Sequence, residues 1–393
     1  MGLLERYGRL LRGTGAAAPL AASLLGRLAL GVTGLALLLL VREETGSYAA
    51  AGLVAAAYAL SFAAFAPVRA RRADRRGPRG VVLLCGLLHP AVLLSLVLLA
   101  AQGAGAAVLA PAAVLAGATV PPLSGVMRAL WGTLAQGEEL TTAYSLESVV
   151  VELCFVGGPL IVAGLTAWAG PSAAVLAAGL LVLLGSCWLA STPALRAVVP
   201  HVHGAGRVAG PLTSPAVRAL LLPVACVGAG FGAVEVALPA FTEAHGAGPS
   251  SAGVLLAVFS VASIAGGLAY GALPLAVPHA RQLPWIFGVL AMGTALPLLA
   301  PTTLLMGLAL LPYGLTIAPF STCNSVLLGR AAPAGTTTEA FAWSGSMIFG
   351  GSALGNGLAG GLVEHSGARA GLVLVAATGL LTLLAGLRGR PRA

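Results

Sequence analysis

Long apolar runs separated by short polar segments are the dominant pattern of this 393-residue chain. We count twelve such runs, and most have about 20 residues or slightly more, the length of an α-helix that crosses a bilayer. Backbone groups inside a bilayer must be paired within the chain, so runs of this length predict membrane helices. The runs cover residues 17–41, 48–68, 80–101, 104–127, 143–168, 171–191, 216–241, 251–272, 284–300, 302–326, 340–363 and 369–387.

The composition agrees with an all-α integral membrane protein. Hydrophobic residues make up 58% of the chain and charged residues only 8%, whereas a soluble domain carries about 25% charged residues. The net charge of +9 does not indicate nucleic-acid binding, because the arginines lie in short segments between runs and not on one basic face. The expected partner is therefore the lipid bilayer, with no nucleic acid.

The distribution of arginines predicts the topology. If the runs alternate in direction, eighteen arginines fall on one side of the membrane, while only Arg42 and Arg369 fall on the other and Arg27 lies within the first run. The positive-inside rule then places both termini in the cytoplasm, which requires an even number of spans and supports twelve. The eighteen are Arg6, Arg9, Arg12, Arg69, Arg71, Arg72, Arg75, Arg76, Arg79, Arg128, Arg196, Arg207, Arg218, Arg281, Arg330, Arg388, Arg390 and Arg392.

The longest interruption divides the chain into two halves of six runs each. We predict an N-terminal six-helix bundle over residues 1–192, a cytoplasmic linker over 193–215 and a C-terminal six-helix bundle over 216–393. The linker contains His201 and His203, but no third metal ligand lies near them in the sequence, so we expect a flexible linker and no metal site.

The two halves also resemble each other in sequence. The segment 46–54 matches 247–255 in spacing, and Thr141–Tyr144 matches Thr338–Phe341. Together with the midpoint linker, these matches indicate a duplicated architecture, which is typical of secondary transporters. At the same offset of 197 residues, three glycines of the first half fall on three of the second: Gly158, Gly164 and Gly170 on Gly355, Gly361 and Gly367.

A basic segment, residues 67–79, separates the second and third runs, and we expect it to form a loop. It contains six arginines and Asp74, the single aspartate of the chain. Its sequence Asp-Arg-Arg-Gly-Pro-Arg, residues 74–79, resembles the loop 2–3 signature of the major facilitator superfamily, Gly-x-x-x-Asp-Arg-x-Gly-x-Arg, with Ala70 in place of the leading glycine. Over the whole chain, the pattern looks most like the bacterial drug-exporter-like permeases. The resemblance implies two pseudo-symmetric bundles that alternate access to a central cavity.

The resemblance also implies a gate. In the superfamily the signature aspartate docks on the N-terminus of the eleventh helix, where free N–H groups and the helix dipole favour an anion. Here that helix would begin near Thr338, and the gating motif would consist of Asp74, Arg75, Gly77 and Arg79.

Two further features of the first half bear on the gate and on the direction of transport. We expect Glu147 to join the gate together with Arg128 or with the arginines of the basic segment. The sequence Gly-Gly-Pro-Leu at 157–160 resembles an element found in the fifth helix of the superfamily's exporters, and it favours export.

Four charged residues fall within apolar runs, where each is a functional candidate because charge is costly at bilayer depth. They are Arg27, Glu147, Glu152 and Glu235. One hypothesis is that Arg27 is neutralised by Glu152, or else by Glu235, and that one of these carboxylates takes up and releases a proton in each cycle. The alternative is a structural ion pair without a coupling role. Asn324 and Asn356 are polar candidates for solute binding, although helix–helix hydrogen bonding explains such residues more often.

No enzyme motif accompanies these residues, and the absence of a P-loop excludes a built-in ATP motor. We therefore expect neither enzymatic activity nor a cofactor. The sequence predicts a monomeric secondary active transporter of the bacterial cytoplasmic membrane, which moves a small organic solute by alternating access, with proton-coupled export as the leading hypothesis. The alternatives are an importer of sugars or small metabolites and a sensor or scaffold of the same shape that does not transport.

Overall fold

The computed structural model describes residues 3–198, 210–246, 249–273 and 277–388. His201, His203 and the rest of 199–209, the middle of the expected linker, lie outside these residues. The longer helices are α2 (Ala17–Thr45), α3 (Tyr48–Arg76), α4 (Pro78–Ala101), α5 (Ala106–Thr119), α6 (Leu123–Leu134), α7 (Gly137–Ala169), α8 (Pro171–Ser191), α10 (Pro215–Ala244), α11 (Pro249–Ala272), α12 (His279–Ala295), α13 (Thr303–Ala331), α14 (Thr337–Ser366) and α15 (Ala368–Arg388). The remaining elements are α1 (Leu3–Thr14), α9 (Pro193–Arg196), η1 (Gly210–Thr213) and η2 (Leu296–Leu299).

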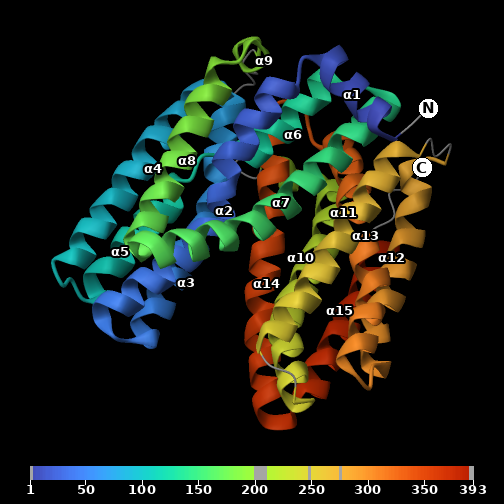
Figure 1. Ribbon diagram of the computed structural model, residues 1–393. Helices are drawn as coiled ribbons and strands as arrows, with labels where there is room; N and C mark the ends of the chain where they lie inside the picture. The colour runs from blue at the N-terminus through green and yellow to red at the C-terminus, as the bar shows by residue number, and fades with distance from the viewer. Residues whose placement is uncertain (1–2, 199–209, 247–248, 274–276, 389–393) are drawn as a thin grey trace.

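The spanning helices form two six-helix bundles with the same internal packing, which confirms the predicted fold class (Figure 1). In the first bundle α2 packs against α7 and α8, and in the second α10 packs against the equivalent helices α14 and α15. Gly170 joins α7 to α8 with φ 83°, and its repeat equivalent Gly367 joins α14 to α15 with φ 78°. Both positions need the left-handed backbone that glycine adopts readily.

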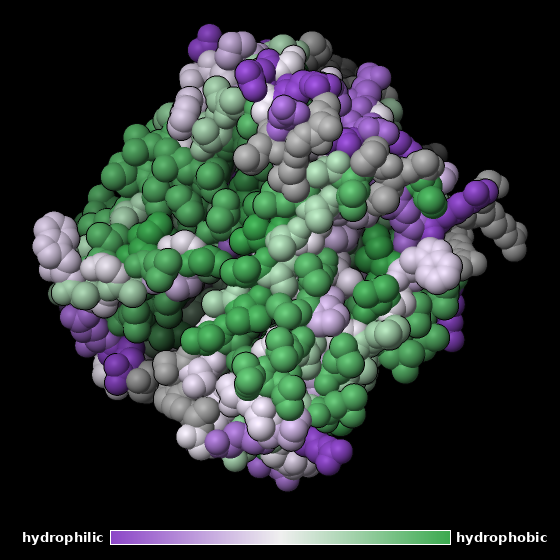
Figure 2. Space-filling model, turned by 45° about the vertical axis from the view of Figure 1, so that its right-hand side comes forward, coloured by the Kyte–Doolittle hydropathy of each residue, from purple (hydrophilic) through white to green (hydrophobic). Residues whose placement is uncertain are grey.

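Eleven helical segments of the described residues have the length and apolar character of a membrane span, and α14 completes the predicted twelve. The fourth span runs from Ala106 to Leu134 and is divided between α5 and α6. On the face shown in Figure 2, hydrophobic side chains cover the middle, and hydrophilic ones gather chiefly toward the edges. The protein is thus a multi-pass membrane protein.

The division of the fourth span follows from Pro121 and Pro122, which have no N–H to offer the carbonyl groups of Gly117 and Ala118 four residues earlier. The buried guanidinium of Arg69 fills this place, because Nη1 donates to both carbonyl oxygens, at 2.9 and 2.8 Å. Arg69 therefore stabilises the break in the helix, a role that the arginine distribution did not predict.

The basic segment 67–79 is helical, whereas the sequence predicted a loop. Helix α3 continues to Arg76, and α4 begins at Pro78, so that Gly77 alone joins the two helices. Arginine is a good helix former, which allows α3 to extend beyond its apolar part. Gly77 has φ 88° and ψ 139°, a conformation that other residues rarely adopt.

Helices α10 and α14 approach closely through a pair of Gly-x-x-x-Gly motifs. An added Cβ at Gly228 or Gly232 of α10 would overlap the backbone of α14, and one at Gly351 or Gly355 of α14 would overlap the backbone of α10. Small residues at such spacing let membrane helices pack backbone to backbone. This contact fixes α14 to its own bundle.

The two bundles lie together at one end of the molecule and diverge toward the other (Figure 1). The end at which they meet carries α1, α6 and α9, and we call it the closed end. The bundles meet there through α3 with α14 and through α7 with α11 and α13. Helix α1, which the apolar pattern did not predict, lies against α7 and α11.

Candidate functional site

The carboxylate of Asp74 binds the N-terminus of α14 at the closed end. Oδ1 accepts a hydrogen bond from the backbone N–H of Thr338 at 3.2 Å, and Oδ2 accepts one from the N–H of Glu339 at 2.9 Å. Thr336, the N-cap residue of α14, makes no side-chain capping bond. Asp74 thus provides from the other bundle what an N-cap side chain normally provides within one helix.

A second charged contact lies directly beside this cap. Nη2 of Arg71 is 2.6 Å from Oε1 of Glu339, and Nε donates to Oε2 at 2.9 Å, so the pair is bidentate. The Glu339 side chain is only 2% exposed. Gly210, with φ 48°, lies so close to this carboxylate that an added Cβ would overlap it. Gly210, a residue of the expected linker, therefore borders the ion pair of Arg71 and Glu339.

The remaining residues of the expected gating motif are placed differently. Gly77 is the hinge between α3 and α4, as described above. Arg75 and Arg79 are exposed, and neither forms an ion pair with a described acidic residue. Of the motif's charged residues, only Asp74 reaches α14 by a direct contact.

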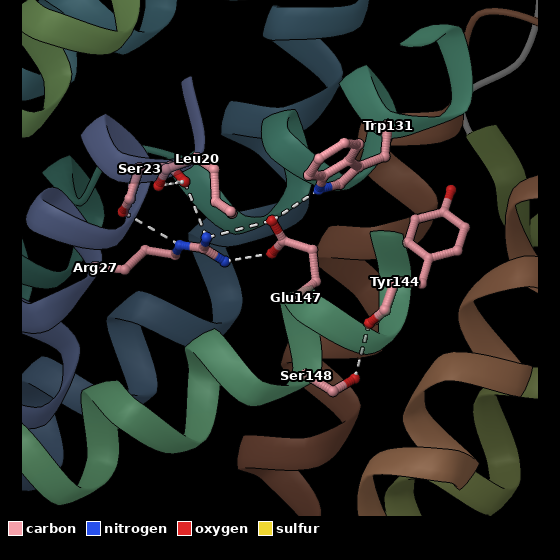
Figure 3. Close-up of polar contacts among 7 residues, drawn as sticks. All are labelled: Leu20, Ser23, Arg27, Trp131, Tyr144, Glu147 and Ser148. Atoms are coloured by element: carbon pink, nitrogen blue, oxygen red, sulfur yellow. Dashed lines mark hydrogen bonds and ion pairs between the residues drawn. The ribbon is translucent and has the colours of Figure 1, made fainter. Parts of the chain in front are cut away.

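Arg27 forms a buried ion pair with Glu147 inside the first bundle (Figure 3). Nη1 of Arg27 lies 2.5 Å from Oε2 of Glu147, and the two side chains are 1% and 0% exposed. Arg27 also donates from Nη2 to the hydroxyl of Ser23 at 2.9 Å, and the indole Nε1 of Trp131 donates to Glu147 at 3.0 Å. Buried charges persist only when they are paired and hydrogen-bonded in this way.

This pair corrects two expectations. Arg27 is neutralised by neither Glu152 nor Glu235, and Glu147 pairs with Arg27 and not with Arg128 or an arginine of the basic segment. The reason is the rotation of α7: five residues turn a helix by about 140°, so Glu147 and Glu152 face different neighbours. Glu147 faces α2, whereas Glu152 faces α11.

Arg128 lies at the junction of the bundles through an aromatic contact. Its guanidinium carbon is 6.0 Å from the ring centroid of Phe341 in α14, within the range of a cation–π interaction. Phe341 also packs against Tyr144 of α7, whose hydroxyl donates to the backbone oxygen of Arg128. Arg128 is therefore placed at the expected gate, with an aromatic partner in place of a carboxylate.

Helices α7 and α11 meet along a row of hydrogen bonds that begins at the closed end. The hydroxyl of Thr142 donates to the Gly271 oxygen at 2.8 Å, and the hydroxyl of Ser145 donates to the Gly267 oxygen. Further along α7, Ser263 donates to Oε1 of Glu152 at 2.8 Å. Glu152 thus lies between the two bundles, and Ser263, which donates to it, offers a neutral hydroxyl.

The other candidates for coupling or solute binding lie in the second bundle. Glu235 of α10 is exposed, and it accepts a hydrogen bond from the amide of Asn356 in α14 at 3.2 Å. Asn324 of α13 is 3% exposed, and its Oδ1 has no hydrogen-bond partner among the described residues. The structure does not bring Arg27, Glu152 and Glu235 together into one site.

The described residues contain no cluster of three or more histidine, cysteine, aspartate or glutamate side chains that could hold a metal ion. At the closed end, charged side chains of the two bundles contact each other, and within the spans Glu152 and Glu235 have no ion-pair partner among the described residues.

Residues 20–338 match the sequence model of the Major Facilitator Superfamily. The chain belongs to this superfamily. It is therefore a member of a family of membrane transporters and not an enzyme, as the sequence predicted. None of the curated proteins matches the chain.

Solved structures of the Major Facilitator Superfamily share the fold at low sequence identity. A bacterial homologue of the iron transporter ferroportin in the outward-facing state has a TM-score of 0.79 and 15% identity, covering 95% of this chain and 98% of its own. The human organic anion transporter MFSD10 has a TM-score of 0.75 and 18% identity, covering 96% and 99%. The fucose:proton symporter of E. coli has a TM-score of 0.74 and 15% identity, covering 97% and 100%.

Several candidate residues could be identified from the sequence, but most of their partners could not. Ser263 and Trp131 carry no signal of their own, because serine and tryptophan are ordinary residues of membrane helices. Glu339 could have been found: it is an acidic residue in the first turn of a predicted helix, and arginines of the basic segment were already expected to lie near that turn.

Proposed function

We propose that the chain is a secondary active transporter that exports a small organic solute by alternating access, in exchange for protons. The observation that carries this proposal is the place of Glu152. It lies between the bundles, within a membrane span, and is bound to Ser263 of the opposite bundle. A carboxyl group at such an interface can couple proton binding to the separation of the bundles.

The partners of Glu152 support this role. A carboxyl group held by a neutral hydroxyl can take up a proton without breaking an ion pair, and Glu152 is held in this way, whereas Glu147 forms an ion pair with Arg27. Low polarity disfavours the charged form of a carboxyl group, so loss of the Ser263 contact would change its proton affinity. Movement of the bundles and proton transfer would thereby become linked.

The balance of charge within the membrane supports a class of solute. Arg27 and Glu147 cancel each other, and Glu152 and Glu235 remain without an ion pair among the described residues. A transport path that passes these two carboxyl groups would favour a neutral or cationic solute over an anionic one. The mostly aliphatic spans favour a solute that is also partly apolar.

The arginine distribution supports the orientation. The basic segment and the start of α1 lie at the closed end, so the positive-inside rule makes the closed end cytoplasmic. With this orientation, the described conformation is closed toward the cytoplasm. We expect a monomer in the bacterial cytoplasmic membrane.

The proposal can be tested with everted membrane vesicles that contain the protein, with ethidium, a lipophilic cation, added to the medium and a pH-sensitive dye to report proton movement. We expect ethidium accumulation driven by the proton gradient, and its loss in Glu152→Gln. Glu364→Gln is the matched control, because Glu364 is exposed near the end of α14. Undiminished proton-driven flux in both Glu152→Gln and Glu235→Gln would exclude the coupling role. Proton-driven uptake in right-side-out vesicles would favour the importer.

A further inference from the structure

Helix α1 lies across the junction of the two bundles at the closed end. It has twelve residues, and its inner face carries Tyr7 and Leu10, which are 8% and 2% exposed. A helix of this length is not stable in water by itself. Its structure therefore depends on the surface to which it is docked, and that surface belongs to both α7 and α11.

One side chain of α1 contacts both bundles. Nη1 of Arg6 donates to the backbone oxygen of Ala272 in α11 at 3.0 Å, and Nη2 forms an ion pair with Glu138 of α7 at 2.7 Å. Beside it, the hydroxyl of Tyr7 donates to the oxygen of Leu268 in α11 at 3.1 Å. These three contacts can all be present only while α7 and α11 are together.

The contacts of Arg6 are suited to the end of α11. The last carbonyl groups of a helix have no N–H partner within the helix, and a cation is favoured at that end by the helix dipole. Arg6 binds the oxygen of Ala272, while Thr142 of α7 binds that of Gly271. Gly271 also leaves room for α1, because an added Cβ would overlap the hydroxyl of Tyr7.

We propose that α1 is a latch that stabilises the closed end, with Arg6 and Tyr7 as its positioning residues. When the bundles separate at this end, Arg6 loses one of its two partners and the inner face of α1 loses half of its docking surface. The latch rests on the proposed alternating access, since it acts on the equilibrium between its two conformations.

The test is a distance measurement on the purified full-length protein. Spin labels are attached at Glu139→Cys in α7 and Ala280→Cys in α12, which are exposed positions of opposite bundles at the closed end, in a background with the native cysteines replaced. We expect one short distance in the parent protein. Arg6→Gln and Tyr7→Phe should add a longer distance, with a population raised by up to about tenfold for Arg6→Gln, because its hydrogen bonds involve a charge.

Arg12→Gln is the matched control. Arg12 is exposed and bonds within α1, to the oxygen of Gly8, so its replacement should leave the distances unchanged. An unchanged distance distribution in both Arg6→Gln and Tyr7→Phe would overturn the latch. A shift in Arg12→Gln equal to theirs would also overturn it, because the effect would then belong to the charge of α1 in general.

The outcome for the latch is separate from that for transport. The distances do not depend on flux, and ethidium flux is measured on the same variants in everted vesicles. Shifted distances without ethidium flux in any variant would leave the latch standing and remove the proposed export. Unchanged distances with normal flux would remove the latch alone.

Discussion

Oδ1 of Asp74 accepts a hydrogen bond from the backbone N–H of Thr338 at 3.2 Å, so that an aspartate of one bundle caps a helix of the other. The contact belongs to the assembled closed end and not to either bundle. Its free energy therefore acts on the equilibrium between conformations, while the fold of each bundle is left intact.

Replacing Asp74 should weaken the closed end without changing the topology, since the arginines that set the orientation remain. Asp74→Ala removes both accepted bonds. Asp74→Asn removes the charge and one acceptor, and it should destabilise the closed end by about 1–2 kcal/mol. We expect both variants to insert normally and to lose most transport, measured as ethidium flux in vesicles. Arg75→Gln is the control; normal flux in Asp74→Asn would mean that the cap does not gate transport.

Arg71 and Glu339 should be coupled in a double-mutant cycle. Arg71→Gln and Glu339→Gln each break the bidentate pair and should destabilise the closed end. The double variant should destabilise it by less than the sum of the two single effects, with a coupling energy of about 0.5–3 kcal/mol. The population of the closed end, measured by the spin-label distances, provides the readout. Additive effects would show that the two side chains do not act together.

The pair of Arg27 and Glu147 should matter for stability more than for the cycle. Either Arg27→Met or Glu147→Gln leaves a buried charge without its partner, at a cost of about 3–5 kcal/mol. The double variant Arg27→Met, Glu147→Met should be less destabilised than either single variant. Thermal unfolding in detergent measures this order. A double variant as unstable as the sum of both would contradict a self-contained ion pair.

The close contact of α10 and α14 gives a prediction with a control in the same helix. Gly355→Ala places a methyl group on the backbone of Ala229 and should destabilise the protein by about 1–3 kcal/mol. Gly357→Ala, two residues further, meets no atom within 4 Å and should be neutral. The difference in melting temperature between the two variants checks the packing. Equal melting temperatures would show that α10 and α14 can move apart without loss of stability.

Much of the fold could be predicted from the sequence because membrane spans are set by length and hydropathy. Asp74 and the start of α14 could be related to each other because the segment resembles a family signature whose aspartate docks on that helix. Helix α1 was missed since twelve amphipathic residues do not produce an apolar run.

The partners of the intramembrane charges could not be predicted, because they depend on how each helix is rotated about its axis. Glu147 and Glu152 share one helix, and hydropathy gives no information on which of them faces Arg27. The same holds for Arg69, whose role depends on two prolines about fifty residues away in sequence. Such contacts arise from tertiary packing, and the local sequence pattern contains no information about it.

The Gly-x-x-x-Gly contact of α10 and α14 has a consequence for the assembly of the protein in the membrane. Helix α14 is long enough to span the bilayer, but it is not among the eleven segments apolar enough to be identified as spans. Insertion by the translocon depends on the hydrophobicity of the inserting segment. We therefore expect α14 to partition into the bilayer with α10 already in place, so that the biogenesis of the second bundle is ordered and its most glycine-rich helix is among the last to enter.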